Sequence, residues 1–251
     1  EYTKDENVYV RMDTEGEVAG TYVVNTFTVT DAGEITDHGH YETIKNLTNL
    51  DSIEEDKEDY TFTAEKGKFY YQGDIVNATL PWNFDISYVL DDKDVDATEL
   101  AGAEGDLEIH LKIDATTDEE VAKFLPAYLL QVKFTLDNNL CEDIVADGAT
   151  IIDTGSKETL SYNIMGDSAE IVITTTVHDF EMDDISITGA PVSDFPVSFV
   201  STDNENVRQT MFLMSAEGVE IPEVEVVEEV EEEEGNFFKQ MVDRFVNRSI
   251  E

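Results

Sequence analysis

Apolar and polar residues alternate through most of the first 222 residues, which is the pattern of β-strands that bury one face. At the start of the chain, Val8, Val10 and Met12 alternate with Tyr, Arg and Asp. Residues 17–29 follow a glycine-containing turn and are rich in β-branched residues and tyrosine. The two segments predict a β-hairpin, and because a hairpin buries only one face, further strands must cover it.

The same alternation predicts a second hairpin and several later strands. Residues 60–63 and 68–71 are separated by a short turn that contains Gly67. Further strands are predicted over residues 83–90, 106–113, 128–136, 149–153, 158–164 and 169–178. One short helix is expected among them, over residues 118–124, and it ends before Pro126 because the residue before a proline disfavours the helical conformation.

These strands and turns predict an all-β protein with two antiparallel β domains. Residues 1–80 are expected to form the first domain, and residues 81–190 an immunoglobulin-like β-sandwich. Residues 196–222 are expected to return and complete the first domain by pairing with its strands. Trp82 starts the second domain, and its large apolar area predicts that it is buried near the domain junction.

The end of the chain follows a different pattern. Residues 223–234 contain eight Glu and neither Lys nor Arg, which predicts an extended acidic linker. Residues 235–251 carry apolar residues at helical spacing and predict a C-terminal amphipathic helix. The apolar face of this helix also includes Val242 and Val246, and its candidate partner-binding residues are Phe237, Phe238, Met241 and Phe245. Such a short helix is marginal in water, so it is expected to order by docking on the sandwich, a second copy or a protein partner rather than on lipid.

The chain is strongly acidic, with 58 Asp and Glu against 15 Lys and Arg in 251 residues and a net charge of −43. Hydrophobic residues make up 41%, which is enough for a packed core and unlike a disordered acidic chain. Phosphate binding needs clustered Lys and Arg, so a nucleic-acid interface is excluded and docking on anionic lipid is disfavoured. The acidity is compatible with solubility in an exposed setting or with a halophilic source.

The sequence contains no apolar run of the length that spans a membrane; the longest candidate, residues 124–130, includes a proline. A secretory signal is not visible, because the chain opens with polar residues rather than a basic and then an apolar segment. The first residue is Glu1 rather than Met, which we interpret as trimming or processing that removed any export signal or anchor.

Residues Asp153, Thr154, Gly155 and Ser156 match the local signature of an aspartic protease. That chemistry needs two carboxylates that share one proton, and the chain has a single copy of the motif. An enzyme of this kind would therefore have to be a symmetric dimer. The same four residues are common turn chemistry between two strands, and the sequence favours this interpretation.

Residues 91–96 place Asp at alternate positions, as calcium loops do. Ala97 and Ala103 stand where an EF-hand loop needs Gly and Glu, so a solvated hairpin tip is favoured. No cofactor is predicted, although the many acidic residues are compatible with weak calcium binding.

Two further candidates are weighed against simpler explanations. His38 and His40 are spaced to share one face of a strand, but the sequence supplies no third metal ligand near them. Cys141, the single cysteine, excludes an intrachain disulfide. Its neighbours Glu142 and Asp143 would raise the pKa of the thiol, so it is not a candidate nucleophile.

Several stretches of the chain, taken together, carry a family resemblance. They are Val8–Val10 with Thr21–Asn25, Gly33–Asp37 with Gly39–Glu42, Pro81–Trp82, Ile86–Tyr88, Leu100–Gly102 before Leu107–Ile109, Gly148–Thr150, Asp179–Met182 and Ser198–Ser201. They resemble the extracellular regions of uncharacterised membrane-anchored proteins of Gram-positive bacteria, some of which are akin to the phage-infection-protein group. Relatives of this kind often carry a long heptad helix before the last β segment, whereas residues 190–196 join the two parts directly here.

This resemblance implies a location and an architecture rather than a reaction. The expected function is a non-enzymatic, cell-surface or secreted binding or structural module of a Gram-positive bacterium, tethered to the cell surface in the full-length protein. Two alternatives remain open. The first is a dimeric aspartic hydrolase that uses Asp153, and the second is a cation-dependent adhesin, whose thermal stability should respond to calcium.

Overall fold

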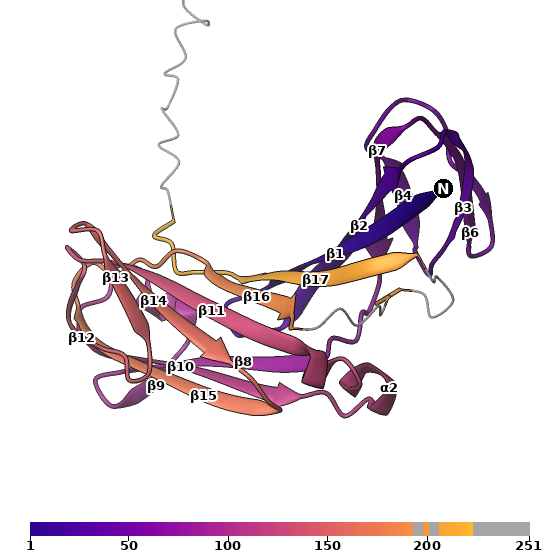
Figure 1. Cartoon of the computed structure of the whole chain (residues 1–251). Coiled ribbons are helices and arrows are strands. Elements are labelled where there is room, and N and C mark those ends of the chain that lie inside the picture. Colours follow the sequence, from indigo (N-terminus) through magenta and orange to yellow (C-terminus); the bar gives the residue numbers. More distant parts are fainter. Residues whose placement is uncertain (193–197, 201–205, 223–251) are drawn as a thin grey trace, which may run out of the picture. The chain divides into compact units, whose positions relative to one another are not determined.

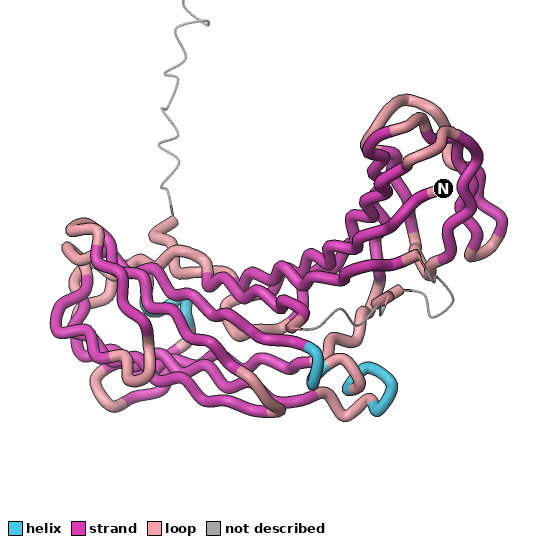
Figure 2. Tube along the Cα trace, in the orientation of Figure 1, coloured by secondary structure: helices cyan, strands magenta, loops and turns pink. Residues whose placement is uncertain are grey.

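The computed structural model of the chain describes residues 1–192, 198–200 and 206–222. Most of these residues lie in strands, and the few helical segments are short (Figure 1, Figure 2). The all-β class predicted from the alternation is therefore confirmed. The acidic linker predicted over 223–234 and the helix predicted over 235–251 lie outside the described residues.

The largest sheet has nine strands, with β1 (Tyr2–Met12) and β2 (Val18–Val29) near its middle. In spatial order its strands are β13 (Thr150–Asp153), β14 (Lys157–Ile164), β11 (Tyr128–Asp137), β16 (Ile185–Pro191), β17 (Val207–Ala216), β1, β2, β7 (Gly67–Ile75) and β4 (Thr43–Asn46). Strand β17 returns from the end of the described chain to lie beside β1 in parallel, as Figure 1 shows.

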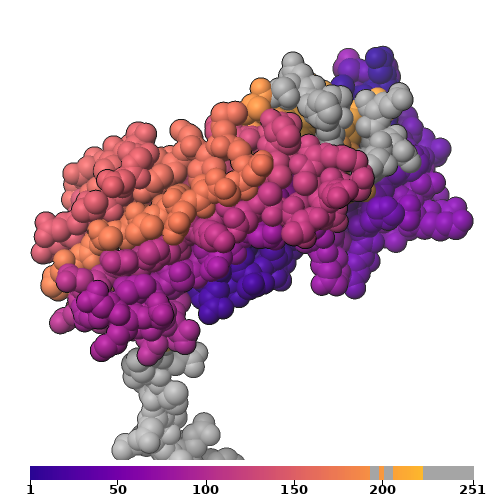
Figure 3. Space-filling model, turned by 90° about the horizontal axis from the view of Figure 1, so that it is seen from below, coloured from indigo at the N-terminus to yellow at the C-terminus, as the bar shows by residue number. Residues whose placement is uncertain are grey.

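Two smaller sheets complete the described chain. One has five strands, in the order β12 (Cys141–Val145), β15 (Ser168–Val177), β10 (Gly105–Ala115), β8 (Trp82–Leu90) and β9 (Lys93–Val95). Figure 3 views this layer from below, with β15 as an orange band beside the purple strands. The other sheet has three strands, in the order β3 (Gly33–His38), β6 (Asp59–Ala64) and β5 (Glu54–Asp56).

Three short helical turns connect the strands: α1 (Ala97–Leu100), α2 (Glu119–Ala122) and the 3₁₀ turn η1 (Leu125–Ala127). Helix α2 lies where the sequence predicts one, over residues 118–124. The carboxylate of Asp118 accepts hydrogen bonds from the backbone N–H groups of Glu120 and Val121, which satisfies donors that a helix start leaves unpaired. This helix is therefore confirmed, together with the side chain that begins it.

Two separate apolar cores hold the sheets together. The larger core joins the five-stranded sheet to the facing strands of the nine-stranded sheet, with Ile109 and Phe134 as typical members. The smaller core joins the three-stranded sheet to the other end of the nine-stranded sheet and is mainly aromatic. It comprises Phe27, Val29, Ile35, Phe62, Ala64, Phe69 and Tyr71. Strand β2 contributes Val23 to the larger core and Phe27 to the smaller one, so the two cores share a backbone.

The predicted hairpin over residues 60–63 and 68–71 is wrong in its pairing. Both segments are strands, but β6 pairs with β3 and β5, whereas β7 pairs with β2 and β4. The chain changes sheets at Gly67, which has a φ of 133° that other residues rarely adopt. The rings of Phe62 and Phe69 then stack face to face across the two sheets, 4.2 Å between centroids, so the core rather than a strand ladder joins the segments.

Trp82 is 3% exposed, so its predicted burial is confirmed. Its ring meets Tyr128 and Phe212 edge to face, with centroids 5.9 and 5.3 Å apart. Residues 1–221 cluster as one compact unit, and the nine-stranded sheet runs through both segments that the sequence assigns to separate domains. The division at residue 80 stays a prediction, and its test is unfolding cooperativity, which is argued below.

Candidate functional site

The aspartic-protease-like motif forms a turn. Asp153 ends the exposed edge strand β13, and its Oδ1 accepts hydrogen bonds from the backbone N–H of Gly155 at 2.7 Å and from the Asn138 amide at 3.1 Å. The carboxylate therefore holds the backbone of a loop, which is the structural use of Asp that the sequence favours.

The acidic segment at residues 91–96 forms the predicted hairpin tip between β8 and β9. Asp91 and Asp92 both have positive φ, and Asp91 Oδ1 accepts a hydrogen bond from the backbone N–H of Asp106. His38 and His40 contact different acids, Asp59 at 2.5 Å and Glu58 at 3.1 Å, and all four side chains are exposed. In the part of the chain that the structure describes, no three His, Cys, Asp or Glu side chains are grouped to hold a metal.

Cys141 is buried, and burial together with the nearby Asp137 charge raises the pKa of its thiol from 9.0 to about 11. The neutral thiol is therefore the form present at neutral pH. The raised pKa agrees with the prediction, but burial and Asp137 cause it rather than the adjacent Glu142 and Asp143.

We expect iodoacetamide to alkylate native Cys141 slowly at neutral pH, because thiolate is the nucleophile and both burial and the raised pKa suppress it. The rate should rise as the pH approaches 11, where the unfolded state is also favoured because an unfolded thiol ionises first. The control is the same chain in denaturant, which should react quickly. Equally fast labelling of the native chain, followed by mass spectrometry, would contradict this expectation.

An open groove of about 1000 Å³ crosses the outer face of the nine-stranded sheet, where β17, β1, β2 and β7 lie side by side. The strand register places Leu213, Tyr9, Tyr22 and Asp74 in one row across these four strands. The rings of Tyr9 and Tyr22 stack with centroids 4.9 Å apart. The next row holds Gly20, whose missing side chain leaves room beside the tyrosine pair.

Exposed apolar side chains line this groove. Val18, Tyr22 and Val76 are 44%, 37% and 58% exposed, which is unusual for residues that gather on one sheet face. They provide a contact surface without any cluster of catalytic groups. The groove is therefore an exposed, partly apolar surface on the outer face of the sheet.

The charged residues around the groove are mostly acidic. The described lining includes the carboxylates of Glu17, Asp74 and Asp184, and Arg11 is the single cation in that set. Hydrogen bonds from Thr43 and then Gln72 lower the pKa of Asp74, so this carboxylate remains charged. The groove therefore combines an apolar floor with a negative rim.

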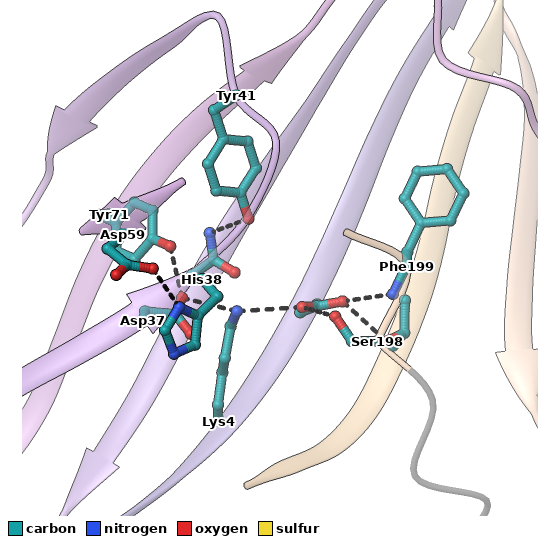
Figure 4. Close-up of polar contacts among 11 residues, drawn as sticks. Lys4, Asp37, His38, Tyr41, Asp59, Tyr71, Ser198 and Phe199 are labelled. Atoms are coloured by element: carbon teal, nitrogen blue, oxygen red, sulfur yellow. Dashed lines mark hydrogen bonds and ion pairs between the residues drawn. The ribbon is translucent and has the colours of Figure 1, made fainter. Parts of the chain in front are cut away.

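A buried cluster of charged side chains lies between the inner face of β1 and the neighbouring strand β3 (Figure 4). We call Lys4 and Glu6 of β1 with Asp37 of β3 the Lys4 cluster; each side chain is 0% exposed. Lys4 Nζ lies 2.8 Å from Asp37 Oδ2 and 3.1 Å from Glu6 Oε1. The cluster occupies the junction of the two cores, since Val8 on β1 belongs to the larger core and Phe27 on β2 to the smaller.

Hydrogen bonds from several segments hold the two carboxylates (Figure 4). Glu6 accepts from Ser198 Oγ at 2.6 Å, from the backbone N–H of Phe199 at 2.9 Å and from Thr210 Oγ1 at 3.2 Å. The hydroxyl of Tyr71 donates to Asp37 Oδ2 at 2.5 Å. These contacts stabilise two anions where burial would otherwise be costly.

Burial and the neighbouring carboxylates have opposite effects on the pKa of Lys4. Burial lowers the pKa of the ammonium, but attraction to Glu6 and Asp37 outweighs it and leaves the pKa raised. Burial also raises the pKa of Tyr41 and Tyr71 well above the ordinary value, and the cluster's carboxylates raise it further. The cluster therefore holds an ammonium ion while it is unbonded, and both tyrosines beside it remain neutral: the Tyr71 hydroxyl donates to Asp37, and the Tyr41 hydroxyl accepts from Asn25.

The sequence analysis did not identify the groove or the Lys4 cluster. The sequence feature that could have indicated the cluster is the position of its charged residues in the alternation. Lys4 and Glu6 follow the same alternation as Val8, Val10 and Met12, so they occupy buried positions of β1. Charged residues in the buried phase of a strand point to a paired internal site. The groove had no such signal, because its row forms only when four strands from three parts of the chain are aligned.

Among the described residues, none of the helices has the length and apolar character needed to span a membrane. The predicted partner-binding residues Phe237, Phe238, Met241 and Phe245 lie outside the described residues. The assignment of partner binding to the terminal helix therefore stays a prediction.

A scan of protein-family models finds no match to the chain, and no curated protein matches it significantly. Among solved structures, it is similar to the Fcho1 mu homology domain of Danio rerio with bound Eps15 peptide, at 9% identity and a TM-score of 0.48, over 86% of this chain and 94% of that one. It is also similar to the yeast delta-COP-I mu-homology domain alone and with a Dsl1 WxWxV peptide, each at 9% identity over 86% of this chain and 95% of the other, with TM-scores of 0.42 and 0.43. Similarity at these TM-scores supports no functional assignment.

Proposed function

We propose that this chain is a non-enzymatic protein-binding module that holds an extended, basic protein segment in the groove over β17, β1, β2 and β7. The single observation that carries the proposal is the groove itself, with the stacked pair Tyr9 and Tyr22 on its floor and carboxylates on its rim. Three strand spacings separate the four strands, which is about 14 Å and the reach of about four extended residues.

Charge complementarity selects the class of partner. The chain carries a net charge of −43, and three of the four charged residues that line the described groove are acidic. A basic segment would be attracted to this surface, whereas an acidic one would be repelled. The apolar floor then accounts for contact area that charge alone does not supply.

We expect a fluorescent peptide of alternating Lys and Val to bind the chain, and Tyr22→Ser to weaken that binding by about tenfold or more. Removing the ring deletes half of the tyrosine stack without opening the core, since Tyr22 is 37% exposed. Fluorescence anisotropy measures the affinity, which should fall as salt rises.

The matched control is Tyr70→Ser, because Tyr70 is 36% exposed on the same sheet but does not line the groove. This variant should bind the peptide as the unmodified chain does. Equal binding of a peptide of alternating Glu and Val, or an unchanged affinity in Tyr22→Ser, would reject the groove as the binding site.

We further propose that the module is exposed on the surface of a Gram-positive bacterium, tethered in its full-length form, and that its larger half is an immunoglobulin-like sandwich. The first part is supported by the sequence resemblance and the acidity of the chain. The second is supported by two antiparallel layers, the five-stranded sheet and the strands β11, β14 and β16, that share the larger core. Digestion by protease added to intact cells of the source organism tests the location, because an internal protein would be protected.

A further inference from the structure

The contact between Lys4 and Asp37 joins an amine to a carboxyl group from different sheets. Lys4 lies on β1 of the nine-stranded sheet, and Asp37 lies on β3 of the three-stranded sheet. Nζ and Oδ2 are 2.8 Å apart, and both side chains are 0% exposed. Two groups that can condense are thus held in direct contact in a site that excludes bulk water.

Glu6 supplies a third group at the same nitrogen. Its Oε1 is 3.1 Å from Lys4 Nζ, and donors from Ser198, Phe199 and Thr210 hold its carboxylate in place. Lys4 Nζ therefore lies within ion-pair distance of both acids, 2.8 Å from Asp37 Oδ2 and 3.1 Å from Glu6 Oε1. One carboxylate can take a proton from the ammonium while the other remains in contact with the nitrogen.

We propose that Lys4 and Asp37 form an internal amide bond, with Glu6 as the proton carrier. Covalent bonding would fasten β1 to β3 and so close the chain from residue 4 to residue 37. This proposal is independent of the groove and of the proposed partner, because the reacting groups lie on the inner face of the sheet.

The reaction balances without an external reagent. The Lys4 ammonium gives one proton to Glu6, and the neutral Nζ attacks Cγ of Asp37 to form the C–N bond. Glu6 returns that proton to the departing oxygen of Asp37. A second proton passes from the nitrogen to the same oxygen, and the C–O bond breaks with loss of water. The three ammonium protons end as one amide hydrogen and two hydrogens of water, and Glu6 is regenerated.

The surroundings favour this outcome. Condensation removes one positive and one negative charge from a site where ions are costly, and it leaves a neutral amide. The Tyr71 hydroxyl, already 2.5 Å from Asp37 Oδ2, can stabilise the negative charge that develops on that oxygen during attack. Burial keeps this hydroxyl protonated, since the pKa of Tyr71 is raised well above its ordinary value.

The test is the intact mass of the purified chain of residues 1–251. We expect a mass lower than the sequence mass by one water molecule, in native and denatured samples alike. Trypsin should fail to cut after Lys4, and peptides 1–11 and 12–45 should remain joined after cleavage at Arg11, because there is no other Lys or Arg within 12–45. An intact mass equal to the sequence mass would overturn the proposal.

Three variants assign the roles. Lys4→Arg keeps a positive charge but cannot form the bond, Asp37→Ala removes the acyl group, and Glu6→Gln keeps the shape of the proton carrier without its basicity. Each should have its full sequence mass and separate peptides 1–11 and 12–45. Circular dichroism identifies a variant that fails to fold, and the mass of the unmodified chain decides the proposal in that case.

Asn25 provides the competing acyl group. It lies opposite Glu6 in the register of β1 and β2, and within the described residues its Oδ1 has no hydrogen-bond partner. Bonding of Lys4 to Asn25 would release ammonia instead of water and would join the same two tryptic peptides. Fragment ions of the joined peptide distinguish the two positions, and a bond at Asn25 would overturn the assignment to Asp37.

Discussion

Lys4→Met is expected to lower the free energy of unfolding by about 3 to 5 kcal/mol, because it leaves Glu6 and Asp37 buried without their cation. Methionine fills a similar volume, so little of the loss comes from a cavity. If Lys4 is bonded to Asp37, the loss is larger, since closing a loop from residue 4 to residue 37 adds about 3 to 4 kcal/mol by analogy with a disulfide. Urea unfolding followed by circular dichroism measures the change.

The raised pKa of Lys4 gives its contribution to stability a definite sign. In an unbonded chain, this contribution is complete below about pH 10, the ordinary range for Lys, and is lost as the pH rises through the raised pKa of the folded state.

Two comparisons separate the buried charge from general effects. Lys112→Met removes a solvent-exposed partner of Asp114 and should leave the unfolding midpoint almost unchanged. The triple variant Lys4→Met, Glu6→Gln, Asp37→Asn removes every charge of the Lys4 cluster and should recover much of the loss. If Lys4→Met is as stable as the unmodified chain at neutral pH, the cluster does not contribute to stability as its burial indicates.

Local patterns were sufficient to locate most strands because each depends on residues close in sequence. The residues Leu107, Ile109, Leu111 and Ile113 alternate with polar neighbours and are all buried in β10, as the pattern predicts. The same alternation did not identify partners. It placed β6 and β7 correctly but paired them, whereas stacking of Phe62 on Phe69 between sheets is a contact that period-two spacing cannot distinguish from a hairpin.

The candidate sites depend on contacts between residues that are far apart in sequence. Lys4 and Asp37 are separated by a hairpin and a change of sheet, so their contact at 2.8 Å could not be predicted from spacing. What could be predicted was that a charged residue in phase with Val8 and Val10 would need a buried partner. The motif at Asp153 is the reverse case, because a short familiar pattern suggested chemistry where the structure shows a turn.

Phe27→Ala and Trp82→Ala are each expected to lower the free energy of unfolding by about 3 to 5 kcal/mol. Phe27 is 0% exposed in the smaller core, and Trp82 is 3% exposed in the larger one. Strand β2 reaches both cores, and Ser198 and Thr210 donate hydrogen bonds to Glu6 of β1 between them. Because the cores share this backbone, we expect the whole unit to unfold in one transition. Each variant should therefore shift that transition as a whole rather than shift a separate transition of its own core.

Differential scanning calorimetry together with circular dichroism tests this expectation. The control is Tyr70→Ala, which removes an exposed ring of the same sheet and should shift the transition little. Two transitions, one moved by Phe27→Ala and the other by Trp82→Ala, would instead support independent domains divided near residue 80. Lys4→Met gives a further test of whether the two cores unfold together. This variant weakens the Lys4 cluster between the cores, and it should produce two transitions only if each core can remain folded alone. A single transition in that variant as well would show that the shared strands β1 and β2, rather than the charged layer, couple the two cores.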